Sequence, residues 1–291
     1  MKNITPVKKQ ISQTGRFLLI GFFVLIASLF FLYPQIFYCE LVALSSFRSP
    51  NGQVYYSPGI PNAGQNKIRK TIGTAEMRVD SFYQGTKATP TFIICSTQEQ
   101  YKKYCSSTEG AGCSIGTPWG SSYVILNAQG LNADVISHEM SHTELLARLG
   151  WWKTTTEIPQ WFNEGLALML DRRFVSNRDP VGRYLDYMDE WSYYTGGGEQ
   201  VLELKDITSI KGFFNGGQRH VMRAYMSAGM EVSYWAVLSG KEGINQLISE
   251  MKTGKSFEES YHNSERIRAR RYFKKLPTNP LRFQDSKKMA E

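Results

Sequence analysis

Cysteine is scarce in this chain, and net charge is nearly absent from its main body. The 291 residues contain four cysteines and no Cys-x-x-Cys pair, and the wide spacing of the four argues against a cysteine-based zinc site. The net charge of +8 comes from the two ends, because residues 17–264 sum to −2 while residues 1–16 carry +4 and residues 265–291 carry +6. A body without excess positive charge lacks the electrostatic footprint of a nucleic-acid-binding surface. We therefore predict no nucleic acid among the partners of this protein.

Charged residues are missing altogether from residues 17–39, and no acidic residue precedes this run. As an α-helix the run would be about 34 Å long, enough to cross a bilayer core of about 30 Å. The aromatic residues at its end are typical of a membrane interface. The sequence predicts a transmembrane anchor in the lipid bilayer over residues 17–39. A cleaved signal peptide is the alternative, although its apolar region is usually shorter.

The basic N-terminus predicts the orientation of this anchor. Positively charged flanking segments stay on the cytoplasmic side of a membrane, so we expect residues 1–16 to be cytoplasmic. Everything from about residue 40 onward would then lie outside the cytoplasmic membrane, in a periplasmic or extracytoplasmic space. The predicted protein is therefore a single-pass membrane protein, and its sequence gives no indication of oligomeric state.

The predicted location outside the cytoplasm favours a disulfide between cysteines of this chain, because thiols there are readily oxidised. We expect one disulfide among Cys95, Cys105 and Cys113, and the sequence leaves the pair open. The third thiol either pairs with Cys39 or stays free. Cys39 itself follows Ile36-Phe37-Tyr38, without the small residues that precede a lipid-modified cysteine.

With 42% apolar residues the chain can form a packed core, and its first part mixes strands with helix. The dense turn signals of residues 40–75 predict a juxtamembrane linker with surface hairpins rather than helix. Residues 89–95 are predicted to form a buried strand and residues 98–104 a short helix. After a glycine-rich loop, residues 121–126 are predicted to form a second strand. The expected fold class is α+β.

The most informative stretch follows these strands, at residues 135–146. Residues four apart lie on the same face of a helix, so His138 and His142 can turn both imidazoles toward one point. Two nitrogens at this spacing suit Zn²⁺, and Glu139 is placed to act as a general base on water at the metal. A catalytic zinc needs a third protein ligand. We predict Glu164 for this role, on a second apolar helix over residues 159–174 that returns antiparallel to the first.

At these residues the chain resembles the gluzincin metallopeptidases, in which His-Glu-x-x-His is followed by Asn-Glu-Gly or a close variant. The matching residues here are 138–142 and Asn163-Glu164-Gly165, twenty-two residues after His142. The metzincin pattern fits worse, because it needs Gly at position 145 and His at position 148. The resemblance implies a zincin-like two-lobe fold over residues 76–262. A mixed sheet and the His-Glu-x-x-His helix form its N-terminal lobe, and helices form its C-terminal lobe.

The resemblance also implies where a substrate would bind. In gluzincins the strand before the metal helix is an edge that pairs with an extended polypeptide, which points to residues 123–127 here. An ordinary interior strand is the alternative. Helices are expected at residues 219–238, 242–251 and 256–271. Residues 176–198 are expected to form a mobile connection or short helices over the cleft. The basic tail of residues 263–291 either lies against anionic lipid headgroups or is solvated.

A developing oxyanion usually needs a donor besides the metal. The aminopeptidase branch of the family places a Tyr some sixty residues after its third ligand, which implies Tyr225 here; Tyr234 and His220 are rivals. Two motifs of related enzymes are absent. Position 168 is Leu where thermolysin-like enzymes have an orienting carboxylate, so Asp171 could serve only from the helix end. The aminopeptidase signature Gly-x-Met-Glu-Asn is also missing, which favours an endopeptidase.

These residues together predict a membrane-anchored zinc metallopeptidase that hydrolyses peptide bonds of a peptide or protein substrate outside the cytoplasm. His138, His142 and Glu164 would hold Zn²⁺, Glu139 would move the proton, and Tyr225 would stabilise the oxyanion. The alternative is a zinc-stabilised binding or scaffold protein of the cell envelope without catalysis. An open groove beside the metal ligands favours the enzyme, and an occluded groove favours the scaffold.

Overall fold

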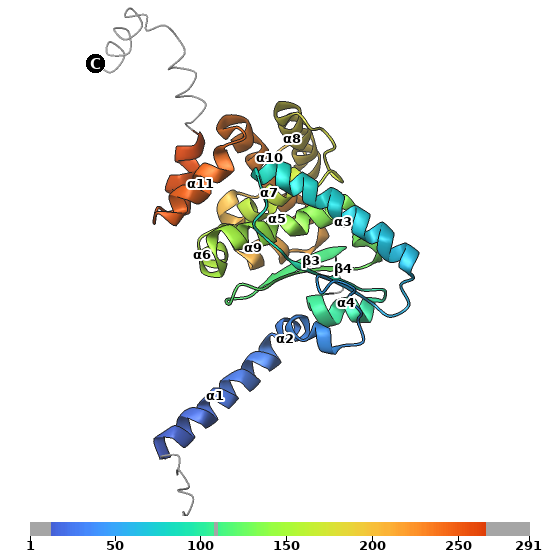
Figure 1. Cartoon of the computed structure of the whole chain (residues 1–291). Helices are drawn as coiled ribbons and strands as arrows, with labels where there is room; N and C mark the ends of the chain where they lie inside the picture. Colours follow the sequence, from blue (N-terminus) through green and yellow to red (C-terminus); the bar gives the residue numbers. More distant parts are fainter. Residues whose placement is uncertain (1–12, 108–109, 266–291) are drawn as a thin grey trace, which may run out of the picture.

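The computed structural model describes residues 13–107 and 110–265, which form a mostly helical molecule around one small mixed sheet (Figure 1). The predicted mixture of helices and strands is therefore confirmed. The outer parts of the predicted N-terminal segment and basic tail, residues 1–12 and 266–291, lie outside the described residues.

The N-terminal helix α1 (Gln13–Leu32) stands apart from the rest of the molecule. Its stretch Gly15–Leu32 has a mean hydropathy of 2.3 and is long and apolar enough to span a membrane. One residue, Tyr33, separates it from α2 (Pro34–Glu40), since Pro34 removes a backbone donor and begins the new helix at its first position. The predicted single run over residues 17–39 is thus two helices.

The expectation of a linker without helix over residues 40–75 is wrong. A 3₁₀ turn η1 (Val42–Leu44) and strand β1 (Val54–Tyr56) are followed by the 22-residue helix α3 (Asn62–Tyr83). The turn signals were real, but they end at Pro61, the residue that precedes α3. The helix buries one face, because its apolar side chains recur at helical spacing. That face consists of Ile68, Ile72, Ala75, Val79 and Tyr83.

The sheet has the order β1-β2-β4-β3. Strands β2 (Thr91–Ile94) and β4 (Ser122–Leu126) were predicted, and β1, β2 and β4 run parallel to one another. Strand β3 (Gly112–Gly116) was not predicted, and it pairs antiparallel with β4 at the edge of the sheet. Strand β4 is therefore an interior strand, which is the alternative predicted for residues 123–127, and the expectation that they form the free edge is wrong.

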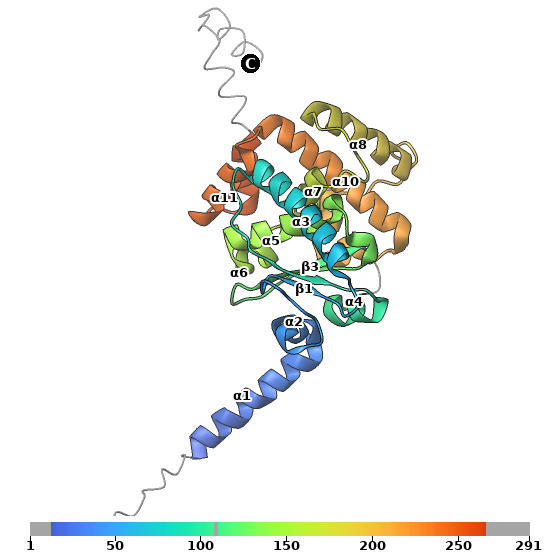
Figure 2. The same cartoon turned by 45° about the vertical axis from the view of Figure 1, so that its right-hand side comes forward.

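Helices cover both faces of this sheet (Figures 1 and 2). Alternate side chains of a strand point to opposite faces. Phe92 and Ile94 pack into the core with α3 and with the predicted metal helix, α5 (Ala133–Leu149). Ile93 and Cys95 pack on the other face against α2 and against α4 (Gln98–Cys105), the predicted short helix. A short turn η2 (Ala128–Gly130) joins β4 to α5.

One disulfide joins Cys105 at the end of α4 to Cys113 on β3, as expected of one pair among the three cysteines. The third, Cys95, remains free, and so does Cys39. Both thiols are buried in the same cluster, where α2 meets the domain.

The remaining helices pack behind α5. The predicted helices at residues 159–174, 219–238 and 242–251 appear as α7, α10 and α11, and the described part of the last one covers residues 257–265. Residues 176–198 differ from expectation, because they contain the sixteen-residue helix α8, which packs against α10. The elements are α6 (Trp151–Thr156), α7 (Gln160–Leu170), α8 (Pro180–Thr195), η3 (Leu204–Ile207), α9 (Ile210–Phe214), α10 (Gly217–Ser239) and α11 (Gly243–Lys252).

Helices α7 and α10 approach each other very closely at Gly165. A Cβ atom at this position would lie 2.4 Å from Val232 Cγ2 and 2.7 Å from the carbonyl oxygen of Ala228. Packing therefore explains the glycine of Asn-Glu-Gly, since any side chain there would push the two helices apart.

Candidate metal centre

Helix α5 presents the two predicted histidines to one point. The helix begins after Asn132, whose side chain accepts hydrogen bonds from the backbone N–H groups of Asp134 and Val135. Its apolar side, which includes Ile136 and Leu145, is buried in the core. The imidazoles of His138 and His142 lie one turn apart with ring centroids separated by 5.1 Å.

Helix α7 brings Glu164 back to this pair, as predicted. Glu164 Oε2 lies 3.3 Å from His138 Nε2, and Glu164 Oε1 lies 3.8 Å from His142 Nε2. The three donor atoms all lie within 4.8 Å of one another. Two ligands at about 2.05 Å from a tetrahedral zinc are about 3.4 Å apart, so the spacing suits one shared ion. The group can therefore hold a metal ion.

The hydrogen bonding of Glu164 also fits a metal ligand. Its Oε1 accepts a hydrogen bond from Gln160 Nε2 at 2.7 Å, one turn earlier on α7. Its Oε2 is buried, and apart from the ion-pair contact with His138 Nε2 at 3.3 Å it has no hydrogen-bond partner among the described residues. A buried carboxylate oxygen without a hydrogen bond is costly, and a cation between Glu164 and the imidazoles would compensate that cost.

Each imidazole is oriented from behind by a different partner. His142 Nδ1 forms a hydrogen bond with Asn163 Oδ1 at 2.9 Å, whereas His138 Nδ1 makes a longer ion-pair contact of 3.5 Å with Asp171 Oδ2. These contacts leave both Nε2 atoms facing Glu164, the arrangement that outer partners impose on metal-binding histidines. Asp171 immediately follows α7, which is the helix-end position that the sequence left open for it. The contact of Asn163 with His142 was not predicted, although Asn163 directly precedes the predicted ligand.

The charges of the site favour a bound cation. Burial of His138 opposes protonation, but Asp171 and Glu164 outweigh it and raise the pKa of His138 to about 10. The pKa of Glu164 is lowered despite its burial, because His142 and His138 stabilise the carboxylate. Asp171 is also buried, and its pKa is lowered by His138 and by the Arg173 guanidinium, which contacts Asp171 Oδ2 at 2.6 Å. Both carboxyl groups are therefore anionic around the imidazoles.

Two glutamates of α5 differ sharply in their surroundings. Glu144 accepts hydrogen bonds from the backbone N–H groups of Lys87 and Ala88 and from Arg148 Nε. Glu139 is nearly as buried, yet among residues 13–107 and 110–265 its carboxylate forms no hydrogen bond or ion pair. It faces the cavity that the metal ligands line.

This cavity has a volume of about 1460 Å³ and is bordered by β3, α6 and α9 as well as by α5 and α7. Strand β3 passes close to α5, because a Cβ atom at Gly112 would lie 3.1 Å from Glu139 Cγ and one at Gly116 only 2.5 Å from Leu146 Cδ2. Glycines at these positions let the sheet edge lie directly beside Glu139. Gln35 of α2 also lines the cavity.

Tyr225 of α10 lines the same cavity. Its ring packs against Phe213 at a centroid distance of 5.1 Å. Burial and the nearby carboxylates of Glu164 and Glu139 raise the pKa of Tyr225 well above its ordinary value, so its hydroxyl keeps its proton. The rival residues do not line the cavity. Tyr234 is 43% exposed, and His220 Nε2 lies 2.7 Å from the carbonyl oxygen of Gly212.

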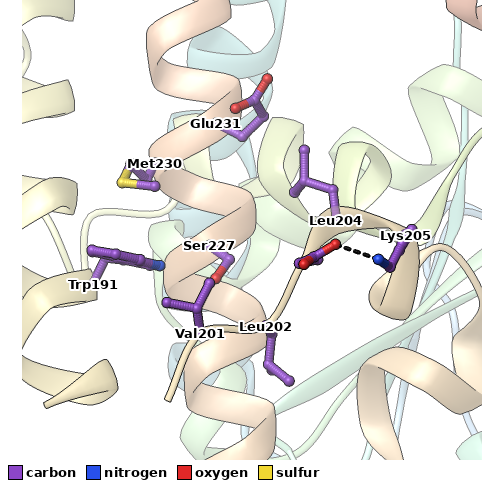
Figure 3. A pocket seen from close by; sticks show the side chains of 9 residues that line it. Trp191, Val201, Leu202, Leu204, Lys205, Ser227, Met230 and Glu231 are labelled. Carbon is purple, nitrogen blue, oxygen red and sulfur yellow. Dashed lines mark ion pairs between the residues drawn. The ribbon is translucent and has the colours of Figure 1, made fainter. Parts of the chain in front are cut away.

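A smaller pocket of about 390 Å³ lies between α8, α10 and residues 201–205 (Figure 3). Trp191, Ser227 and Met230 approach it from the helices, and its wall includes the ion pair of Lys205 with Glu203. No imidazole or thiol lines this pocket, so it offers none of the chemistry found at the metal ligands.

No protein-family model and no curated protein sequence matches this chain. The function must therefore be inferred from the residues and geometry of the site.

Proposed function

We propose that this protein is a membrane-anchored zinc metallopeptidase of the gluzincin type that hydrolyses peptide bonds outside the cytoplasm. One observation carries the proposal. The unpartnered carboxylate of Glu139 lies beside His138, His142 and Glu164 in a cavity large enough for a peptide. Helix α1 would be the anchor, with residues beyond it outside the membrane.

Zinc is the metal that this ligand set suits best. Two imidazole nitrogens and one carboxylate are a common catalytic zinc set, and they leave the fourth position of a tetrahedron to water or substrate. A zinc ion held there would act as a Lewis acid that polarises the peptide carbonyl and makes water a better nucleophile. The two outer partners, Asp171 and Asn163, would hold the imidazoles in the tautomer that leaves Nε2 free to bind.

Glu139 would transfer the proton, and Tyr225 would stabilise the negative charge that develops on the substrate oxygen. The Glu139 carboxylate accepts a proton from the water that attacks the peptide carbonyl, and it then delivers this proton to the leaving amine nitrogen. The Tyr225 hydroxyl keeps its proton, so it can donate a hydrogen bond to the carbonyl oxygen as negative charge develops there.

The edge strand β3 would bind the substrate. Its outer side has no strand partner among the described residues, and it runs beside Glu139. An extended polypeptide could add to this edge through main-chain hydrogen bonds, which would tolerate many sequences. This assigns to β3 the role that the resemblance gave to residues 123–127. The sheet with α5 would form one lobe, and α7 with α10 the other.

The open cavity favours the enzyme over the scaffold alternative. A protein that used the metal only for stability would have no need for a carboxylate that faces an open cavity beside the metal ligands without a partner among the described residues. The position of Glu139 is explained if the carboxylate works on a substrate.

Replacement of Glu139 tests the proposal in the full chain purified in detergent micelles. Glu139→Gln should retain one zinc ion per chain and lose at least about 100-fold in turnover of a peptide-library substrate, the usual scale for loss of a general base. The matched control is Glu157→Gln, because Glu157 lines the same cavity and is paired with Lys153. Full activity of Glu139→Gln, or equal losses in both variants, would contradict the proposed role.

A further inference from the structure

The cavity of the metal centre extends to the membrane end of the molecule. Gln35 lines it together with His138 and Glu139. Gln35 is the third residue after Leu32, the last residue of α1, so their Cα atoms are at most about 11 Å apart. The side-chain oxygen of Gln35 is buried without a hydrogen-bond partner, so an acceptor stands unused at this end of the cavity.

The joint between anchor and domain fixes this arrangement. The Phe30 ring of α1 packs against Phe37 of α2 at 5.3 Å, which braces the bend around Tyr33. On the domain side, Cys39 is completely buried, and Glu40 Oε1 accepts a hydrogen bond from Trp119 Nε1 at 2.6 Å. Helix α2 is thus packed into the domain, and only Tyr33 separates it from α1.

Exposed aromatic side chains lie on the side of the domain to which α1 leads. In both views α1 leads away from the side of the domain on which α6 and the β3–β4 connection lie (Figures 1 and 2). Trp152 of α6 is 69% exposed, and Trp119 of the β3–β4 connection is 63% exposed. Tryptophan is enriched where protein meets lipid headgroups. Ile210 and Phe214, also exposed, lie on the wall of the cavity itself.

We propose that the cavity accepts the membrane-proximal segment of a polypeptide anchored by its own transmembrane helix in the same bilayer, while Trp119 and Trp152 rest in the headgroup layer. This inference depends on the proposed function and names its substrate class. A polypeptide leaving the bilayer beside α1 meets the Gln35 end of the cavity within its first few residues. Confinement of both chains to one membrane raises their effective concentration, provided that the geometry lets them meet.

The experiment uses the full chain in vesicles of phosphatidylethanolamine and phosphatidylglycerol. One cleavable sequence, selected beforehand with the enzyme in detergent micelles, is placed about 5, about 20 or about 40 residues outside a single transmembrane helix, and it is also supplied as a free peptide. In vesicles we expect cleavage of the nearest site to be at least about tenfold faster than cleavage of the farthest site or the free peptide.

A spacer separates the geometric effect from simple confinement. A Gly/Ser insert of about 12 residues after Tyr33, with an average span of about 20 Å, should abolish the preference for the nearest site. The same insert between Gly196 and Gly197, in an exposed turn, should leave it intact. Replacing Trp119 and Trp152 by Ser should weaken the preference without changing turnover of the free peptide in micelles.

The outcomes distinguish this inference from the function on which it rests. If no substrate is hydrolysed in a chelator-sensitive manner, in micelles or vesicles, the peptidase itself is refuted. If wild type hydrolyses the near, far and free sites at equal rates, or if the spacer after Tyr33 has no effect, the membrane-proximal substrate is refuted and the peptidase stands.

Discussion

Glu139 and Glu144 lie five residues apart on the same helix, and both are buried, with exposed fractions of 8% and 0%. Glu144 is surrounded by donors from the backbone and from Arg148, whereas Glu139 has none among the described residues and faces the cavity. A buried charge with all its hydrogen bonds made belongs to the architecture, because its burial is compensated. A carboxylate that faces an open cavity without such partners is available to a substrate. Hydrogen bonding therefore distinguishes the two glutamates more sharply than their exposed fractions do.

Among these variants, we expect the largest change in free energy from a substitution of Glu144. Glu144→Gln should lower the free energy of unfolding by about 3–5 kcal/mol, because it leaves the buried Arg148 guanidinium without its counter-charge. Urea denaturation of the full chain in micelles measures this, and Glu139→Gln should change stability by less than about 1 kcal/mol. If Glu144→Gln fails to fold, the double variant Glu144→Leu with Arg148→Met should recover stability. Equal stability of the two single variants would remove the distinction.

We expect Tyr225 to share the catalytic role proposed for Glu139. Tyr225→Phe should lower kcat by about 100-fold with KM nearly unchanged, because the lost hydrogen bond would form only as charge develops on the substrate oxygen. Steady-state kinetics on the full chain measures both constants. Tyr234→Phe is the matched control, since Tyr234 lies on the same helix outside the cavity. A larger loss in the control than in Tyr225→Phe would reassign the oxyanion donor.

Asp171 resembles both glutamates. It is paired with Arg173, as Glu144 is with Arg148, and it also contacts a predicted metal ligand. Asp171→Asn should weaken zinc binding by about 10- to 100-fold, the usual effect of losing the charged partner of a metal-bound histidine. Titration against a chromophoric chelator gives the affinity. An unchanged zinc affinity would show that Asp171, like Glu144, only stabilises the fold.

The smallest expected effect is at Asn163, the neutral partner of His142. Asn163→Ala removes one hydrogen bond, worth about 1 kcal/mol, so zinc affinity should fall by about fivefold. The same chelator titration applies. A loss as large as that in Asp171→Asn would show that orientation of the imidazole, rather than the charge of its partner, controls the affinity.

The helical part of the site was predictable because a 3.6-residue period fixes which side chains share a face. This rule alone predicted the placement of His138, Glu139 and His142. The placement of Glu164 required one further assumption, that the second helix runs antiparallel to the first. The role of Asp171 depends on where α7 ends, which residue spacing alone does not determine.

Two elements of the fold escaped prediction for opposite reasons. Strand β3 contains Gly112 and Gly116, which weaken the strand signal but are required where the strand lies against α5. Helix α3 begins directly after a cluster of Pro, Gly and Asn, and the density of turn signals hid its apolar stripe. In both cases tertiary contacts outweighed local preference.

The close approach at Gly165 makes the candidate metal site sensitive to a substitution that changes no ligand. Gly165→Ala adds one methyl group, carries no charge and lies outside the ligand set. Because Val232 and the Ala228 carbonyl already occupy the space, the backbone of α7 must shift, and the neighbouring carboxylate of Glu164 moves with it. Gly165→Ala would thus lower metal affinity without altering any ligand. The distance between α7 and α10 leaves room for the hydrogen atom of a glycine and not for a methyl group.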